Sequence, residues 1–215
     1  MISFINRKQM YFFERIYRYA SVPIVKGLAK TDITPNMVTI TNFILSFFNT
    51  YLLFNNKASF ISAFLILVYY FLDVVDGNLA RFTGKTSKLG ARLDDIGDGL
   101  FYNIFIIVVG LGNVSFEILL TLLIIHNFYS FITTNYIVPN IRRIKVFKRI
   151  GIKKWLMAHG VILGVDLSLI GILLACAIVS KQYVFVYKLI IILYLLDIIY
   201  RFTELWINKY LDKNN

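Results

Sequence analysis

The sequence has little charge for its length and very few cysteines or prolines. Of its 215 residues, 16% are charged and 58% are hydrophobic. A soluble domain carries about a quarter charged residues, so a water-soluble globular fold is excluded. The single cysteine, Cys176, excludes an internal disulfide framework and any multi-cysteine zinc or iron–sulfur site. The three prolines leave long helices possible.

Long apolar runs take the place of that missing charge. A bilayer core of roughly 30 Å requires about 20 apolar residues in a helix. The runs also lack the alternation that is typical of a membrane barrel. We therefore predict an all-α integral membrane protein. Its six expected transmembrane helices cover about residues 37–54, 59–81, 94–112, 115–138, 161–180 and 183–207.

The formal net charge of +11 is concentrated on one side of these spans. The connections assigned to the opposite side carry only Lys57 and Lys181. The positive-inside rule therefore places both termini on the cytoplasmic side of the cell membrane. Topology and anionic lipid headgroups account for the basic excess, so no nucleic acid partner is expected. The cations on the predicted cytoplasmic side are Arg7, Lys8, Arg15, Arg18, Lys26, Lys30, Lys85, Lys88, Arg92, Arg142, Arg143, Lys145, Lys148, Arg149, Lys153 and Lys154.

The chain is expected to form an N-terminal cytoplasmic segment, residues 1–36, followed by one transmembrane domain, residues 37–215. In the first segment, positions 13, 16, 17 and 20 fall on one apolar helical face, whereas Arg15 and Arg18 lie largely on another. This pattern predicts an amphipathic helix on the membrane surface, with a disordered basic tail as the alternative. Pro35 is placed where the first turn of a span tolerates proline.

Five of the twelve acidic residues lie within 26 positions at the ends of the second and third spans: Asp73, Asp76, Asp94, Asp95 and Asp98. Carboxylates at membrane depth are costly and repel one another unless cations neutralise them. Asp73 and Asp76 share one helical stripe, and Asp94 and Asp98 share another. Asp95 is rotated by about 100° around the helix from Asp94 and should point elsewhere. The connection 82–89 is short, so we expect the two stripes to face each other.

Four carboxylates without cysteine or a nearby histidine form a hard-oxygen site. Such a site suits Mg²⁺, Mn²⁺ or Ca²⁺ rather than zinc or copper, and four acidic groups favour two ions over one. Arg81 lies on the first stripe and is a candidate to bind phosphate. Gly77 and Gly90 have no side chains, so the backbone and a substrate can approach each other at the opening of the expected site. These features indicate phosphoryl transfer. Asp98, the deepest of its stripe, is the candidate general base for a substrate hydroxyl.

This region resembles the signature of the CDP-alcohol phosphotransferase (CDP-alcohol phosphatidyltransferase) family. The matching residues are Asp73-x₂-Asp76-Gly77-x₂-Ala80-Arg81-x₈-Gly90-x₃-Asp94-x₃-Asp98, and Pro35-Asn36-x₂-Thr39 at the start of the first span. The resemblance implies six spans, an interfacial helix and a homodimer. It also implies transfer of a substituted phosphate from a CDP-linked donor to an alcohol, with release of CMP, in phospholipid biosynthesis.

By this resemblance, Asp73, Asp76, Asp94 and Asp98 are metal ligands, and Asp98 is also the base. Mg²⁺ or Mn²⁺ is the expected cofactor, with two ions bound. Lys85 is added as a candidate for the donor phosphates. The residues expected at the CDP moiety are thus Asn36, Thr39, Asp73, Asp76, Gly77, Ala80, Arg81, Lys85 and Gly90.

The substrates are less constrained than the reaction. CDP-diacylglycerol is the favoured donor, with glycerol phosphate, serine, inositol or inositol phosphate as acceptor. The alternative is a soluble CDP-linked alcohol of the choline, ethanolamine or polyol type that reacts with a lipid or polyol acceptor. Two other classes stay open: a divalent-metal transporter, which would place its acids nearer mid-bilayer, and a catalytically silent scaffold.

Arg142, Arg143 and Arg201 are candidates to bind an anionic acceptor such as a polyol phosphate. The positive-inside rule alone also explains Arg142 and Arg143. Arg201 has another explanation, because Asp197 and Arg201 are spaced i, i+4 in the last span and could neutralise each other. Asp166 is expected either to bind polar substrate or to pair with a basic residue of the preceding connection. His126 is expected to be a hydrogen-bonded interior residue rather than a metal ligand.

Overall fold

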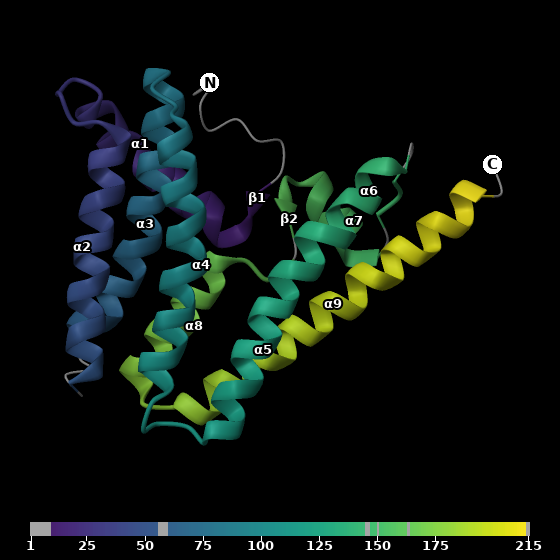
Figure 1. The fold of residues 1–215 in the computed structure, drawn as a ribbon. Coiled ribbons are helices and arrows are strands. Elements are labelled where there is room, and N and C mark those ends of the chain that lie inside the picture. Colours follow the sequence, from purple (N-terminus) through teal and green to yellow (C-terminus); the bar gives the residue numbers. More distant parts are fainter. Residues whose placement is uncertain (1–9, 56–59, 145–146, 150, 163, 214–215) are drawn as a thin grey trace.

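The computed structural model describes residues 10–55, 60–144, 147–149, 151–162 and 164–213, and these are mostly helical (Figure 1). The all-α prediction is confirmed. Four of the predicted loop cations, Arg7, Lys8, Lys57 and Lys145, lie outside the described residues. The elements are β1 (Met10–Tyr11), α1 (Phe12–Leu28), α2 (Pro35–Phe54), α3 (Phe60–Thr83), α4 (Lys88–Gly110), α5 (Phe116–Ile132), the π-helix η2 (Thr133–Ile137), α6 (Val138–Arg143), α7 (Gly151–Ala158), β2 (Val161–Ile162), α8 (Leu167–Ser180) and α9 (Tyr183–Lys213).

The long helices form two groups that diverge toward one end (Figure 1). Helices α2, α3, α4 and α8 pack in one group, and α5 packs along α9 in the other. Helices α1, α6 and α7 lie at the end where the two groups separate. The short parallel pair β1–β2 lies at the same end and joins the start of the described chain to the segment before α8.

Among the described residues, four helical stretches are long and apolar enough to cross a membrane: Pro35–Phe54, Phe60–Thr83, Phe116–Arg143 and Tyr183–Leu211. The other two predicted spans differ from expectation. The helix α4 begins at Lys88 rather than near residue 94, because Ser87 caps it by accepting a bond from the Gly90 amide at 2.9 Å. Its first half also carries three aspartates.

The predicted start of the fifth span is wrong. Val161 and Ile162 pair with Met10 and Tyr11 as a parallel two-stranded ladder, and the helix begins at Leu167. Asp166 sets that start because its carboxylate caps the first turn. Helix α8 therefore rises about 21 Å, which is shorter than a bilayer core of roughly 30 Å.

A polar seam holds α2 against α3. Thr39, Asn42, Ser46 and Asn49 recur every three or four residues and are all buried. The Asn42 amide donates to the Tyr69 carbonyl at 3.0 Å, and the Asn49 amide to the Ser62 carbonyl at 3.1 Å. Side-chain hydrogen bonds of this kind associate helices in lipid, where no hydrophobic driving force acts between them. The seam thus sets how the start of α2 lies beside the end of α3.

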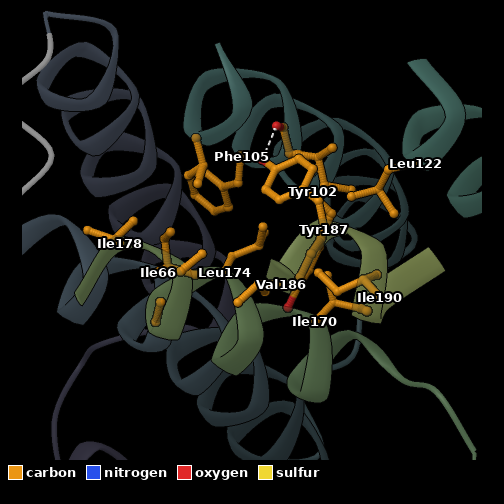
Figure 2. Close-up of a cluster of buried hydrophobic side chains, with 14 of the residues drawn as sticks. Ile66, Tyr102, Phe105, Leu122, Ile170, Leu174, Ile178, Val186, Tyr187 and Ile190 are labelled. Carbon is orange, nitrogen blue, oxygen red and sulfur yellow. Dashed lines mark hydrogen bonds between the residues drawn. The ribbon is translucent and has the colours of Figure 1, made fainter. Parts of the chain in front are cut away.

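The apolar core lies where α3, α4, α8 and α9 meet (Figure 2). Tyr102 and Phe105 of α4 and Tyr187 of α9 are completely or almost completely buried in it. The Tyr187 hydroxyl donates to the Ile106 carbonyl at 2.6 Å, so its ring is held by a hydrogen bond as well as by packing. This core joins the two helix groups at the end opposite α1.

Helix α1 turns the polar face that carries Arg18 into the protein, which the sequence did not predict. Glu14 and Arg18 are buried, and the Arg18 Nε donates to the Glu14 carboxylate at 2.7 Å. Burial is possible because the two charges neutralise each other and α3 supplies a further hydrogen bond. Large apolar side chains such as Ile16 and Ile24 are exposed instead.

The close packing around Gly110 predicts that a larger side chain there destabilises the core. A Cβ at this position would lie 2.9 Å from Leu119 Cδ1 and 3.0 Å from the Tyr187 hydroxyl, which its hydrogen bond restrains. Gly110→Ala should therefore destabilise the protein by about 1–3 kcal/mol. Gly27→Ala in α1 is the matched control, because a Cβ there meets nothing within 4 Å. Thermal unfolding in detergent measures both, and equal melting temperatures would contradict the packing described.

Candidate metal centre

A tight hairpin brings the ends of α3 and α4 together. Helix α3 ends at Thr83, and Gly84 adopts a left-handed backbone with φ of 69°, which an L side chain would strain. The chain then reverses, and the Ser87 cap starts α4. The two aspartate-bearing helix segments consequently face each other, as the sequence predicts.

Three carboxylates converge at this hairpin. Asp73, Asp76 and Asp94 each offer an oxygen, and these oxygens all lie within 4.8 Å of one another. Asp76 is buried, Asp73 is half-buried and Asp94 is exposed. Asp98, one turn deeper in α4, does not belong to this three-residue group. The structure therefore brings together three of the four predicted metal ligands.

Two further observations bear on the fit of a metal ion. The Thr39 hydroxyl donates to Asp76 Oδ2 at 2.6 Å and so orients that carboxylate from α2. One oxygen of Asp98, Oδ1, is buried and accepts no hydrogen bond from the residues that the structure describes. Converging carboxylates with no histidine or cysteine in the group suit a hard divalent cation. The residues present thus fit such an ion.

A cavity of about 210 Å³ opens on one side of the carboxylates, and we name it the motif cavity. Its walls come from the start of α2, the end of α3 and the start of α4. A Cβ on Gly90 would lie 2.9 Å from Asn36 Oδ1, so this glycine keeps the wall open. Of the residues predicted to hold CDP, all but Asp73 line the motif cavity: Asn36, Thr39, Asp76, Gly77, Ala80, Arg81, Lys85 and Gly90.

A second cavity of about 430 Å³ is lined by residues of α4, α5, η2 and the start of α8, and we name it the α4–α5 cavity. Asp98 belongs to its wall rather than to the wall of the motif cavity. The π-helix η2 contributes Thr133 and Thr134, and the Thr133 hydroxyl is buried with no partner among the described residues. The lining residues are Asp95, Asp98, Gly99, Asn103, His126, Asn127, Tyr129, Ser130, Thr133, Thr134, Val165, Asp166, Leu167 and Tyr194.

Polar contacts shape the wall of the α4–α5 cavity. Asn103 and Asn127 exchange hydrogen bonds between their amides, the shorter at 2.7 Å. His126 lies 2.8 Å from the Tyr194 hydroxyl, which confirms its prediction as a hydrogen-bonded interior residue. Asp166 forms no ion pair with a basic residue of the preceding connection among the described residues; it accepts bonds from the Ser168 hydroxyl and from backbone amides at the start of α8. It is a helix cap that also lines the cavity.

The three arginines predicted for the acceptor lie outside both cavity walls as the structure describes them. Arg142 and Arg143 are exposed at the end of α6. Arg201 is buried, and it donates to Asp197 at 2.6 Å and to the Tyr11 hydroxyl at 3.0 Å. The expected Asp197–Arg201 pair is therefore present. Arg201 also lies 5.7 Å from the ring centre of Tyr129, which does line the α4–α5 cavity.

The sequence did not predict a network of ion pairs between α9 and the segment around α7. Lys153 of α7 is 2% exposed and lies 3.9 Å from Asp197 and 3.7 Å from Glu204. Arg149 also pairs with Glu204 at 2.9 Å. Burial lowers the pKa of Lys153 from its usual value, and the nearby guanidinium of Arg201 lowers it further. The signal in the sequence was the spacing of Asp197 and Glu204, which puts two acids on one face of α9.

Comparisons with known proteins place this arrangement in a family. A family model described as CDP-alcohol phosphatidyltransferase matches residues 32–209. An archaetidylinositol phosphate synthase of Pyrococcus horikoshii is 42% identical over 77 residues, which is 36% of this chain and 40% of that protein. A phosphatidylinositol phosphate synthase of Mycobacterium tuberculosis is 32% identical over 74 residues, or 34% of each chain. The aligned part thus spans less than half of the length of these curated relatives.

The carboxylate group predicts that substitutions of the adjacent residues Asp94 and Asp95 differ strongly in their effect on Mn²⁺ affinity. Asp94→Asn removes one oxygen ligand and should weaken Mn²⁺ binding by about tenfold or more. Asp95→Asn removes the same charge from the next position of α4, outside the group, and should change the affinity by less than about twofold. Mn²⁺ titration followed by electron paramagnetic resonance measures both. An equal loss in the two variants would mean that general charge, not ligation, attracts the ion.

Proposed function

The chain belongs to the CDP-alcohol phosphatidyltransferase family, and we propose that it transfers a phosphatidyl group from CDP-diacylglycerol to a polyol phosphate with release of CMP. Family membership makes it a membrane-bound transferase of substituted phosphate groups that acts in phospholipid biosynthesis. The observation that carries the proposal is the carboxylate group, which borders the motif cavity through Asp76 and Asp94, with Asp98 one turn along α4 in the wall of the α4–α5 cavity.

The motif cavity is assigned to the CDP moiety of the donor. Its wall combines two cations, Arg81 and Lys85, with the hydroxyl and amide groups of Thr39, Ser87 and Asn36. Cations and neutral donors are the groups that recognise a pyrophosphate and a nucleoside. Asp76 and Asp94 belong to the same wall, so a pyrophosphate in this cavity would lie next to the carboxylate group.

The α4–α5 cavity is assigned to the acceptor alcohol. Asp98 faces it, and a carboxylate there can accept the proton of a bound hydroxyl. The acceptor oxygen then attacks the phosphorus distal to cytidine, and the bond from that phosphorus to the bridging oxygen breaks. The proton resides on Asp98 and the electron pair leaves with the phosphate of CMP. Asp73, Asp76, Asp94 and Asp98 would hold two Mg²⁺ or Mn²⁺ ions, which neutralise charge on the pyrophosphate.

A polyol phosphate, and an inositol phosphate in particular, is the favoured acceptor. The names of the similar proteins specify synthases of inositol phosphate lipids. The wall of the α4–α5 cavity offers several hydroxyl and amide groups, which suit a molecule with many hydroxyls. We keep Arg142, Arg143 and Arg201 as the candidates for the acceptor phosphate, and Arg201 lies 5.7 Å from the ring centre of Tyr129, which lines this wall.

The proposed membrane arrangement has six spans with both termini and the active site in the cytoplasm. The end of the helices that carries the motif also carries Lys26, Lys85 and Arg142, whereas Lys181 lies at the other end, between α8 and α9. In this arrangement residues 1–36 form the interfacial segment, with α1 along the membrane surface, and residues 37–215 form the transmembrane domain. The family resemblance further implies a homodimer, which a mass measurement in nanodiscs would test.

A product analysis tests the proposed reaction. The purified protein is incubated with labelled CDP-diacylglycerol, Mg²⁺ or Mn²⁺ and a panel of acceptors that includes inositol and inositol phosphate. Mass spectrometry should find an inositol phosphate lipid and an equal amount of CMP. A product from a soluble CDP-linked alcohol, with none from CDP-diacylglycerol, would overturn the assigned donor. A product formed with inositol but not with inositol phosphate would overturn the proposal that the acceptor is phosphorylated.

The proposed base gives a second prediction. Asp98→Asn keeps the size of the side chain but cannot accept the hydroxyl proton. Its kcat should fall by about 10²–10⁴-fold, the usual contribution of a general base. Binding of CDP should change far less, because Asp98 does not line the motif cavity. Turnover by Asp98→Asn close to that of the wild type would exclude Asp98 as the base.

A further inference from the structure

Asn78 lies inside the aspartate motif but is not one of its fixed positions. Its side chain is completely buried between α1 and α3. The amide oxygen accepts a bond from Arg18 Nη1 at 3.0 Å and another from Arg81 Nη2 at 2.7 Å. The amide nitrogen donates to the Ser21 hydroxyl at 2.7 Å. One neutral side chain thus joins two arginines and a serine from two helices.

We propose that Asn78, together with Arg18 and Ser21 of α1, is a positioning residue that holds Arg81 for the pyrophosphate of the donor. The inference rests on the proposed function, because it takes the motif cavity to be the donor site. It makes α1 a structural part of that site, in addition to any role at the membrane surface.

The geometry gives Asn78 this role because it donates no charge but holds the guanidinium of Arg81, a long, exposed side chain on the wall of the motif cavity. Such a side chain loses much rotamer freedom when a ligand immobilises it, and this loss weakens binding. A hydrogen bond at 2.7 Å orders the guanidinium before the ligand arrives. Ser21 fixes the amide in turn, so that its oxygen points toward the two arginines.

The charge of the side chains supports an amide at this position. The carboxylate of Glu14 pairs with Arg18 at 2.7 Å, so the buried cation of α1 is compensated within its own helix. Asn78 is neutral and orients Arg81 through a hydrogen bond without forming an ion pair with it. A carboxylate at position 78 would attract Arg81 and reduce the positive charge available to phosphate. An amide at position 78 therefore orients Arg81 without adding negative charge to the motif cavity.

The test measures CDP binding by isothermal titration calorimetry in the presence of Mn²⁺. Asn78→Ala should weaken CDP binding by about tenfold, as expected when a hydrogen bond to a charged group is lost. Asn49→Ala is the matched control, because Asn49 is also a buried helix asparagine but contacts the Ser62 carbonyl, away from the motif. The control should bind CDP within about twofold of the wild type.

Ser21→Ala provides a milder variant in case Asn78→Ala does not fold. It leaves Asn78 and both arginines in place and should weaken CDP binding by about threefold, in line with the loss of one neutral hydrogen bond. In turnover assays the KM for the donor should rise in both variants, while the KM for the acceptor stays unchanged. A purely structural role would change both KM values or neither.

The outcomes separate the two proposals. If the wild type binds CDP and the Asn78 and Ser21 variants bind it equally well, the positioning role is wrong and the proposed function stands. Equal losses in the Asn78 and Asn49 variants would likewise reduce Asn78 to a structural residue. If the wild type itself does not bind CDP in the presence of Mn²⁺, the donor assignment fails and the positioning role fails with it.

Discussion

The structure depends on neutralising carboxylates that the neighbouring helices α3 and α4 hold close together. Asp73, Asp76 and Asp94 bring their oxygens within 4.8 Å of one another, where like charges repel strongly. Only one of them, Asp76, receives a hydrogen bond from α2, through Thr39. Divalent cations bound there would relieve this repulsion and would at the same time attract the pyrophosphate of the proposed donor. The electrostatic cost of the cluster and its proposed chemistry therefore have one origin.

The remaining architecture supports that cluster from both sides. The polar seam of α2 sets the position of Thr39, and the hairpin at Gly84 sets the distance between α3 and α4. The divergence of α5 and α9 from the other helices leaves the α4–α5 cavity beside Asp98 (Figure 1). A donor and an acceptor could thus approach the carboxylates from two directions, as an in-line transfer requires.

The sequence was most informative where spacing along one helix determines proximity. The i, i+3 and i, i+4 spacings of the aspartates, together with the short connection, predicted the convergence of four carboxylates, of which Asp73, Asp76 and Asp94 form the group and Asp98 lies outside it. Features that depend on how separate helices pack were not predictable from one sequence. Arg18 and Lys153 were both counted among the cytoplasmic cations because their partners lie far away in the sequence, Asn78 at 60 positions from Arg18 and Glu204 at 51 from Lys153. The capping role of Asp166 was not predicted because the fifth span was expected to start near Val161 rather than at Leu167.

Anomalous diffraction at the manganese edge, from crystals grown with Mn²⁺ and CDP, tests the central claim most directly. The account predicts manganese peaks coordinated by oxygens of Asp73, Asp76 and Asp94, with the pyrophosphate of CDP on the side of Arg81. Manganese bound elsewhere, or CDP bound in the motif cavity with no metal at these carboxylates, would contradict it.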